Sequence, residues 1–233
     1  MILKKWDKLP ENFKNDAVRV YYDMLKKKRF SLFFKRIFDI LLSAFLLVLL
    51  SPIFLILAVI IKLDSKGPVF YRQVRVTTYG KNFKIFKFRT MVQNADKIGT
   101  QVTVNNDSRV TKVGLILRKF RLDELSQLID VFRGTMTFVG VRPEVPKYVQ
   151  HYTDEMLATL LLPAGITSKT SILYKDENEL LDSSKDIDKT YIEKILPDKM
   201  KLNLEGIREF SLLTDFKIMF MTVAAMLGKE YNN

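Results

Sequence analysis

One stretch dominates the pattern of hydrophobic positions, running from Ile37 to Ile61. From Ile40 to Ile61 it holds no charged residue and consists mainly of Leu, Ile, Val and Phe. At about 1.5 Å of rise per helical residue, such a run could cross the ~30 Å hydrocarbon core of a bilayer. The pair Ser51-Pro52 lies near its middle, where proline removes a helical hydrogen bond and crowds the preceding turn. Hydropathy alone predicts a crossing helix, and this pair offers a place where the chain turns back.

The residues before this run mix lysines with apolar side chains. Over residues 1–34 this pattern predicts an amphipathic helix that lies at the level of the lipid headgroups. The alternative is a helix packed on the soluble body. The first thirty residues lack the basic start, apolar core and small-residue cleavage site of a secretory signal, so we expect the apolar run to be retained as an anchor.

The remainder of the chain predicts several short elements. Val69–Val76 and Phe83–Thr90 are rich in β-branched and aromatic residues and indicate a hairpin, joined by a loop over 77–82. Helical periodicity and breakers predict helices over 111–119, from Leu122 to a stop at Gly134, over 147–161 and, in pieces, over 175–201. The other predicted elements are a polar loop over 92–108, a strand over 135–139, a rigid turn over 142–146 and a core or interfacial helix over 210–227.

These elements together predict a mixed α/β protein that is mostly helical and has a small β-hairpin. We divide it into an interfacial N-terminal segment (1–34), a membrane helix broken at Ser51-Pro52 (35–62) and a catalytic domain with an apolar C-terminal helix (63–233). A length of 233 residues leaves room for one domain and an anchor.

Charge supports a membrane location. The formal net charge is +12, and several cations flank the apolar run: Lys26, Lys27, Lys28, Arg29, Lys35 and Arg36. Such clusters suit the anionic cytoplasmic leaflet. A membrane-tethered nucleic-acid binder is the weaker interpretation, because no nucleic-acid-binding motif occurs. The chain has no cysteine, which excludes disulfides, thiolate catalysis and Cys-type metal sites.

The candidate chemistry lies between Arg118 and Glu124. No Gly-x-Gly occurs, so a glycine cradle for nucleotide phosphates is excluded, and the single histidine, His151, is interpreted as structural. Asp123 and Glu124 are adjacent carboxylates at a helix start among three cations, where they should stay ionised and be able to hold Mg²⁺ or attack phosphorus. The plainer alternative is a helix cap with a solvated acidic neighbour.

Four motifs in one order carry a family resemblance. They are Lys87-Phe88-Arg89-Thr90-Met91, Asp107-Ser108-Arg109-Val110-Thr111 with Gly114 and Leu117-Arg118, Leu122-Asp123-Glu124-Leu125 with Gln127-Leu128, and Val139-Gly140 with Arg142-Pro143-Glu144. Together with the stretch from Arg36 to Phe70, the chain resembles the bacterial sugar transferases, the monotopic polyprenyl-phosphate phosphoglycosyl transferases. The resemblance covers roughly residues 35–170.

The resemblance implies an activity and roles for residues. The family transfers a sugar 1-phosphate from a UDP-sugar to undecaprenyl phosphate, with Mg²⁺, and releases UMP. By resemblance Asp123 is the nucleophile that forms a covalent phosphosugar, and Glu124 binds Mg²⁺ and assists the acceptor step. Arg142 and Pro143 fall where the family contacts the nucleotide. The resemblance also implies that Lys87, Arg89 and Arg118 bind phosphate.

Departures from the family pattern leave the donor sugar open. Val141, Thr135 and Ser126 replace residues that are common in the family, and the segment over 162–168 lacks the usual arginine and tryptophan. The nucleophile is unaffected.

The resemblance also changes the interpretation of the apolar run. Because the acceptor phosphate lies at the headgroups and UDP-sugars lie in the cytoplasm, we expect a re-entrant helix pair at the cytoplasmic face of the bacterial inner membrane. The expected partners are the UDP-sugar, undecaprenyl phosphate and membrane lipids, without nucleic acid, and a homo-oligomer is left open. Two rivals are the same transfer without a covalent step and a non-catalytic scaffold for glycan assembly, which would need neither carboxylate.

Overall fold

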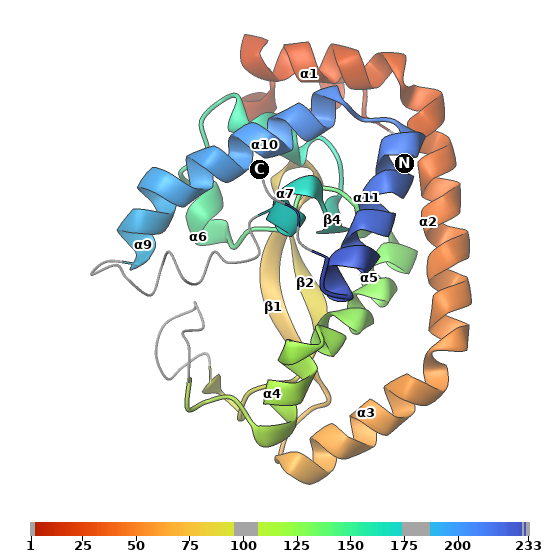
Figure 1. Ribbon diagram of the computed structural model, residues 1–233. Helices are drawn as coiled ribbons and strands as arrows, with labels where there is room; N and C mark the ends of the chain where they lie inside the picture. Colours follow the sequence, from red (N-terminus) through yellow and green to blue (C-terminus); the bar gives the residue numbers. More distant parts are fainter. Residues whose placement is uncertain (1–2, 96–106, 174–186, 230, 232–233) are drawn as a thin grey trace.

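The computed structural model describes residues 3–95, 107–173, 187–229 and 231 (Figure 1). In these residues the protein is mixed α/β and mostly helical, with two small sheets of two strands each. The predicted fold class is confirmed at that level. Most of the predicted polar loop, residues 96–106, and the first part of the charged segment over 175–201, residues 175–186, lie outside the described residues.

The N-terminal segment folds onto the body of the protein. Two 3-10 turns, η1 (Trp6–Lys8) and η2 (Glu11–Phe13), precede α1 (Asp16–Lys27), whose first turn is capped by the side chain of Asn15. The apolar face of α1 is buried in a core cluster shared with the C-terminal helices. The prediction that this face lies at the headgroups is therefore wrong, because its side chains already have protein partners. Those side chains are Val18, Tyr21, Tyr22 and Leu25.

The apolar run forms two helices, α2 (Arg29–Leu49) and α3 (Ser51–Asp64), which meet at a 60° bend (Figure 1). Pro52 lies in the first turn of α3, where its missing N–H costs nothing. The Ser51 hydroxyl donates to the Val48 carbonyl at 2.8 Å. The predicted break at Ser51-Pro52 is thus confirmed, although α2 begins at Arg29 rather than at residue 35. No helix within the described ranges is by itself long and apolar enough to span a bilayer, whereas the bent pair together meets that criterion.

The predicted hairpin is confirmed with a shorter connection. β1 (Phe70–Thr77) pairs antiparallel with β2 (Lys81–Phe88) through the turn η3 (Thr78–Gly80), in a register that places Phe70 opposite Phe88. Ile85 and Phe88, which point to opposite faces of β2, are both buried, in two different core clusters.

The next elements, which follow the hairpin and the undescribed residues, pack near the end of β2. α4 (Lys112–Lys119) is capped by Thr111, and its Gly114 sits so close to Thr90 that a Cβ there would lie 2.0 Å from the Thr90 carbonyl oxygen. A 3-10 helix, η5 (Leu122–Gln127), and α5 (Leu128–Arg133) replace the single helix predicted from Leu122. Gly134 ends α5 with φ 86°, as predicted for a left-handed stop.

A second, parallel sheet follows. β3 (Met136–Val139) pairs with β4 (Ala164–Thr167), so that Met136 lies opposite Ala164. Between them the predicted helix over 147–161 is wrong: only α6 (Pro146–Val149) and the 3-10 helix η6 (Met156–Leu160) form. Leu160 and Leu161, at the end of η6, are buried in the core.

The C-terminal part contains α7 (Lys169–Leu173), α9 (Ile187–Thr190), a π-helical turn η7 (Tyr191–Ile195), α10 (Leu196–Arg208) and α11 (Leu212–Met226). α10 packs against α1 and carries core residues, among them Leu204 and Ile207. α11 carries no buried residue, so of the two alternatives for this segment the core helix is wrong.

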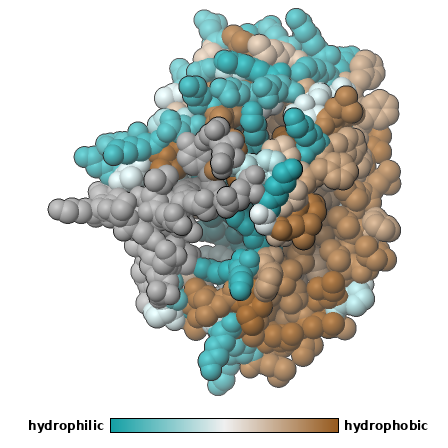
Figure 2. All heavy atoms as spheres, in the orientation of Figure 1, coloured by the Kyte–Doolittle hydropathy of each residue, from teal (hydrophilic) through white to brown (hydrophobic). Residues whose placement is uncertain are grey.

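Apolar side chains gather over the edge of the molecule that α2 and α3 form (Figure 2). Helices α2, α3 and α11 all carry exposed large apolar residues, namely Leu41, Phe45, Val48, Leu55, Ile56, Val59, Leu63, Leu213, Phe220 and Val223. An exposed apolar surface of this kind marks a membrane or protein contact rather than a face in water.

Candidate active site

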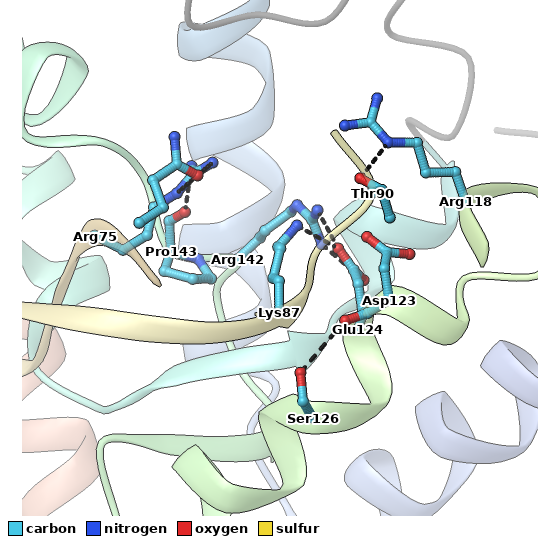
Figure 3. Close-up of polar contacts among 10 residues, drawn as sticks. Arg75, Lys87, Thr90, Arg118, Asp123, Glu124, Ser126, Arg142 and Pro143 are labelled. Atoms are coloured by element: carbon cyan, nitrogen blue, oxygen red, sulfur yellow. Dashed lines mark hydrogen bonds and ion pairs between the residues drawn. The ribbon is translucent and has the colours of Figure 1, made fainter. Parts of the chain in front are cut away.

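Three elements bring the predicted site residues together (Figure 3). Lys87 lies near the end of β2, Asp123 and Glu124 lie in the first turn of η5, and Arg142 lies in the turn after β3. The hairpin strand β2 packs against η5, and this packing places Lys87 beside the carboxylates. Lys87 lies 37 positions and Arg142 lies 18 positions from Glu124 in the sequence, yet both contact it directly.

Glu124 is held between two cations. Its Oε1 accepts from Arg142 Nη2 at 2.7 Å and from Lys87 Nζ at 3.0 Å, and its side chain is only 14% exposed. Burial alone would raise the pKa of Glu124, but Arg142 and Lys87 outweigh it and hold the pKa well below the usual range. Glu124 is therefore an ionised group in a fixed position.

Asp123 has a different environment. It makes no ion pair within the described parts of the chain, and its carboxylate points toward the space between Glu124 and Arg118 in Figure 3. Burial raises the pKa of Asp123, and Glu124 adds to this, while Lys87 and Arg118 act in the opposite direction. A partly buried carboxylate without a partner is available for a ligand or a reaction.

The backbone before the carboxylates is strained. Arg121 adopts a left-handed conformation with φ 52°, which costs of the order of 1 kcal/mol in a residue other than glycine. The kink at Arg121 separates α4 from η5 and places Asp123 in the first turn rather than at the cap. Asp123 therefore lies within the helix start, and the alternative of a helix cap is wrong.

Arg118 lies on α4 above Asp123 (Figure 3). Its Nε donates to the Thr90 hydroxyl at 2.8 Å, which ties α4 to the end of β2. Burial lowers the pKa of Arg118, yet a guanidinium remains charged under any ordinary condition. The arrangement gives Asp123 a nearby cation without an ion pair.

Pro143 and Arg75 extend the site along β1. The Pro143 carbonyl accepts from Arg75 Nη1 at 3.0 Å, and the Gln73 side chain accepts two further bonds from the same guanidinium (Figure 3). Pro143 itself is buried, so it shapes the turn. The sequence does not single out Arg75, because its contact to residue 143 depends on how the hairpin packs.

Comparison with known proteins decides the family. The model of the family described as "Bacterial sugar transferase" matches residues 30–229. The chain belongs to the bacterial sugar transferase family. The resemblance inferred from the ordered motifs is thereby confirmed.

Several curated relatives of this sugar transferase are similar over most of its length. It is 40% identical to the UDP-glucose:undecaprenyl-phosphate glucose-1-phosphate transferase of Escherichia coli over 81% of its own chain and 39% of the relative. It is 35% identical to a UDP-N-acetylgalactosamine-undecaprenyl-phosphate N-acetylgalactosaminephosphotransferase of Aeromonas hydrophila, over 84% of its chain and 44% of the relative. Exopolysaccharide production protein ExoY of Sinorhizobium fredii is 32% identical, with 82% and 84% covered. The chain thus spans about two fifths of the first two relatives.

One predicted phosphate ligand of the sugar transferase lies elsewhere. Arg89 is 6% exposed, and its Nη2 donates to the Ser65 carbonyl at 2.6 Å, the Ser65 hydroxyl at 2.9 Å and the Ile61 carbonyl at 3.3 Å. These groups end α3, where a cation complements the unpaired carbonyls. The Arg89 guanidinium is thus held at the end of α3, away from Glu124, and its role in binding substrate phosphate stays a prediction.

The donor groups of the sugar transferase restrict how Mg²⁺ could bind. The described residues contain no group of three or more His, Cys, Asp or Glu side chains suited to a metal. Asp123 and Glu124 alone fit the common magnesium arrangement, in which one or two carboxylates share the ion with substrate phosphates. The site therefore fits a metal that arrives with a phosphorylated ligand.

Proposed function

We propose that this chain transfers a sugar 1-phosphate from a UDP-sugar to undecaprenyl phosphate and releases UMP. The observation that carries the proposal is the contrast within one acidic pair: Asp123 has no ion pair in the described residues, while Glu124 beside it is fixed by Lys87 and Arg142. Family membership and the named activities of the relatives support the same reaction. The proposed process is the first membrane step of a surface glycan pathway.

In the first half-reaction, an Asp123 carboxylate oxygen attacks the phosphorus that carries the sugar. The bond from this phosphorus to the bridging oxygen breaks, UMP leaves with the electron pair, and an aspartyl phosphosugar forms. Arg118, Lys87 and Arg142 place positive charge around the pyrophosphate, which is a poor electrophile until its charge is reduced.

In the second half-reaction, a phosphate oxygen of undecaprenyl phosphate attacks the same phosphorus. The bond from this phosphorus to the Asp123 oxygen breaks, and the free carboxylate is restored together with the lipid diphosphosugar. Division into two steps lets a soluble donor and a lipid acceptor react in turn.

Glu124 would hold Mg²⁺ together with the donor phosphates, and the ion would reduce phosphate charge there. Because Glu124 is already ionised and held in place, it needs no rearrangement to act as a ligand.

The membrane arrangement that accompanies this function is a re-entrant pair, α2 and α3, at the cytoplasmic face of the inner membrane. Three observations support it: the 60° bend, the exposed apolar residues of both helices and the cations near the start of α2. A turn-back would keep the N-terminal segment and the catalytic body on one side, as the packing of α1 on that body requires.

Labelling can test this topology directly, because the chain has no cysteine of its own. Single variants Lys5→Cys and Lys201→Cys place thiols at exposed positions before and after the bent pair. In intact spheroplasts we expect an impermeant maleimide to label neither, and after permeabilisation to label both. Labelling of only Lys5→Cys in intact cells would mean that the pair crosses the membrane.

The activity test is UMP release from a panel of UDP-sugars with undecaprenyl phosphate, beginning with UDP-glucose and UDP-N-acetylgalactosamine. A catalyst gives UMP with at least one donor, whereas a scaffold gives none. Isotope exchange between UMP and UDP-sugar without the lipid acceptor separates the two enzymatic mechanisms. The covalent route produces exchange, and direct transfer with Asp123 and Glu124 as metal ligands only does not.

A further inference from the structure

A second buried carboxylate lies two residues after Arg142. Glu144 is 7% exposed, and its Oε1 accepts from the Tyr191 hydroxyl at 2.5 Å and lies 3.4 Å from Lys199 Nζ. Lys199 Nζ also donates to the Tyr191 oxygen at 2.9 Å. All three residues are buried, and a charge in such surroundings is stable only with its partners in place. Glu144, Tyr191 and Lys199 therefore form one fixed unit, which we term the Glu144 network.

The turn that carries Arg142 is held from its other side by β1. Arg75 donates to the Pro143 carbonyl at 3.0 Å, and the Val76 N–H donates to the Glu144 carbonyl at 2.9 Å. Pro143 and Glu144 are thus fixed through their backbones by β1, and Glu144 is fixed through its side chain by the Glu144 network. Arg142 directly precedes Pro143 in this turn, and its guanidinium reaches Glu124.

The C-terminal partners lie where the helix is irregular. Tyr191 begins the π-helical turn η7, which lies between α9 and α10, and Pro197 follows in the first turn of α10. Proline has no N–H to donate to the carbonyl four residues before it, so a regular α-helix cannot continue through this point. Single π turns inside α-helices are frequent at functional sites. Here the irregular turn delivers Tyr191 to Glu144.

Arg142 needs such support because it is only partly enclosed. Its side chain is 38% exposed, and a long exposed side chain loses rotamer freedom when it is held in one ion pair. A rigid backbone at residues 142–144 lowers that cost, since the guanidinium then starts from a fixed position. The buried contacts of Glu144 supply that rigidity.

We propose that Glu144, Tyr191 and Lys199 are positioning residues that fix the 142–144 turn and thereby hold Arg142 on Glu124 in the active site. This inference rests on the proposed function, in which Arg142 meets the donor phosphates. It assigns the C-terminal helices a part in the reaction, although their side chains in the Glu144 network touch neither Asp123 nor Glu124.

The test compares Tyr191→Phe in two backgrounds, wild type and Arg142→Gln. Tyr191→Phe keeps the ring and removes only the hydroxyl that donates to Glu144. In wild type we expect kcat for UMP release to fall roughly tenfold, the effect of one lost hydrogen bond to a charged group. In the Arg142→Gln background we expect less than a twofold further loss, because the Glu144 network then has no guanidinium to position.

The matched control is Tyr148→Phe. The Tyr148 ring packs on Tyr191 with centroids 4.3 Å apart, and its hydroxyl donates to Asp188 at 2.9 Å rather than to Glu144. This variant should keep UMP release within twofold of wild type. Equal losses for Tyr191→Phe in both backgrounds, or equal losses for the two tyrosine variants, would reduce the Glu144 network to a merely structural feature and overturn the proposal.

A second measurement does not depend on activity. Amide hydrogen exchange of residues 142–145 without substrate should be at least tenfold faster in Tyr191→Phe than in wild type and unchanged in Tyr148→Phe. Wild-type protein that releases no UMP would contradict the proposed function, but faster exchange would still show that Tyr191 fixes this turn. Unchanged exchange in an active enzyme would overturn the positioning role alone.

Discussion

Two clusters of buried charge differ in whether each carboxylate has a partner within the protein. This difference distinguishes a reactive site from one that stabilises the fold. In the active site Glu124 pairs with Lys87 and Arg142, but Asp123 has no ion pair in the described residues. Beneath α2 every carboxylate is engaged. Asp215 of α11 pairs with Lys35, which is 4% exposed.

Asp39 completes the second cluster. It is 1% exposed and accepts from the Thr137 hydroxyl at 2.7 Å and the Phe138 N–H at 3.4 Å. These contacts join α2 to β3, as Lys35 joins α2 to α11. A carboxylate with all its partners supplied by the protein serves the fold, whereas Asp123 is left available for a ligand.

Replacement of aspartate by asparagine should lower activity in the active site and lower stability in the cluster beneath α2. The loss of activity is the largest effect we expect. Asp123→Asn should lower UMP release by at least ~10³-fold, because an amide cannot act as the nucleophile. The stability of the fold should be unchanged or higher. Burial raises the pKa of Asp123, so its ionised form is less favourable in the folded than in the unfolded state. That penalty develops as the pH rises through the raised pKa, and asparagine removes it.

Asp39→Asn is the matched control. One acceptor oxygen becomes a donor facing Thr137 or Phe138, which should cost about 1–3 kcal/mol of unfolding free energy. The folded fraction should still release UMP. Steady-state UMP release and the thermal unfolding midpoint in nanodiscs measure both effects. Equal loss of activity in the two variants would contradict the distinction between the clusters.

The ion pair beneath α2 should yield the largest loss of stability. Lys35→Met leaves the Asp215 carboxylate buried without its cation, and removal of one partner of such a pair costs about 3 kcal/mol. Replacement of both partners, Lys35→Met with Asp215→Leu, should recover most of that loss, since no charge then remains unpaired. Chemical denaturation of wild type and the two variants in detergent measures this. Equal stability of the single and double variants would mean that the pair is not coupled.

The pH profile should sharpen the description of the active site. UMP release requires ionised Asp123, whose pKa is raised by burial, while the pKa of Glu124 is held well below its usual range by Arg142 and Lys87. Activity should therefore fall on the acid side as Asp123 protonates, at a pH where Glu124 is still ionised. Arg118→Gln removes a cation that lowers the pKa of Asp123, so the acid limb should move to higher pH.

The measurement is kcat/KM for the UDP-sugar as a function of pH, which reports groups of the free enzyme. Lys119→Gln is the control, because it removes a neighbouring cation of α4 that is not among the groups acting on the pKa of Asp123. A shift of the acid limb to lower pH in Arg118→Gln would show that Asp123 is not the group that titrates.

Much of the fold could be predicted from local patterns, but the partner of each apolar face could not. The segments that form α1 and α11 both read as amphipathic or interfacial helices. Yet Tyr21 and Leu25 of α1 are buried in the core, while Phe220 of α11 is 75% exposed. Periodicity defines which side of a helix is apolar. What covers that side depends on distant segments, such as α10 folding back over α1.

The site was predictable where residues adjacent in sequence share a role. Asp123 and Glu124 needed only their local charge pattern and the family motifs, and Lys87 and Arg142 were then placed beside Glu124 as expected. Arg89 follows the end of β2, and its guanidinium contacts Ser65 at the end of α3, because position in the sequence does not define where a long side chain ends. Arg75 was not singled out because its partner, the Pro143 carbonyl, lies 68 positions away.

The smallest effect we expect tests whether every buried polar group beneath α2 matters. Ser43 is fully buried, and its hydroxyl donates to the carbonyls of Asp39 at 2.5 Å and Ile40 at 3.1 Å, both in its own helix. Bonds of this kind back to the preceding turn add little, because the Asp39 carbonyl already accepts a helical bond. Ser43→Ala should thus change the unfolding free energy by less than about 0.5 kcal/mol, with UMP release unchanged, since alanine also has the better helix propensity. A loss of unfolding free energy as large as that of Lys35→Met would mean that the Ser43 hydroxyl holds the Asp39 side of the cluster in place. Ser43, one turn further along α2, would then belong to the essential polar groups.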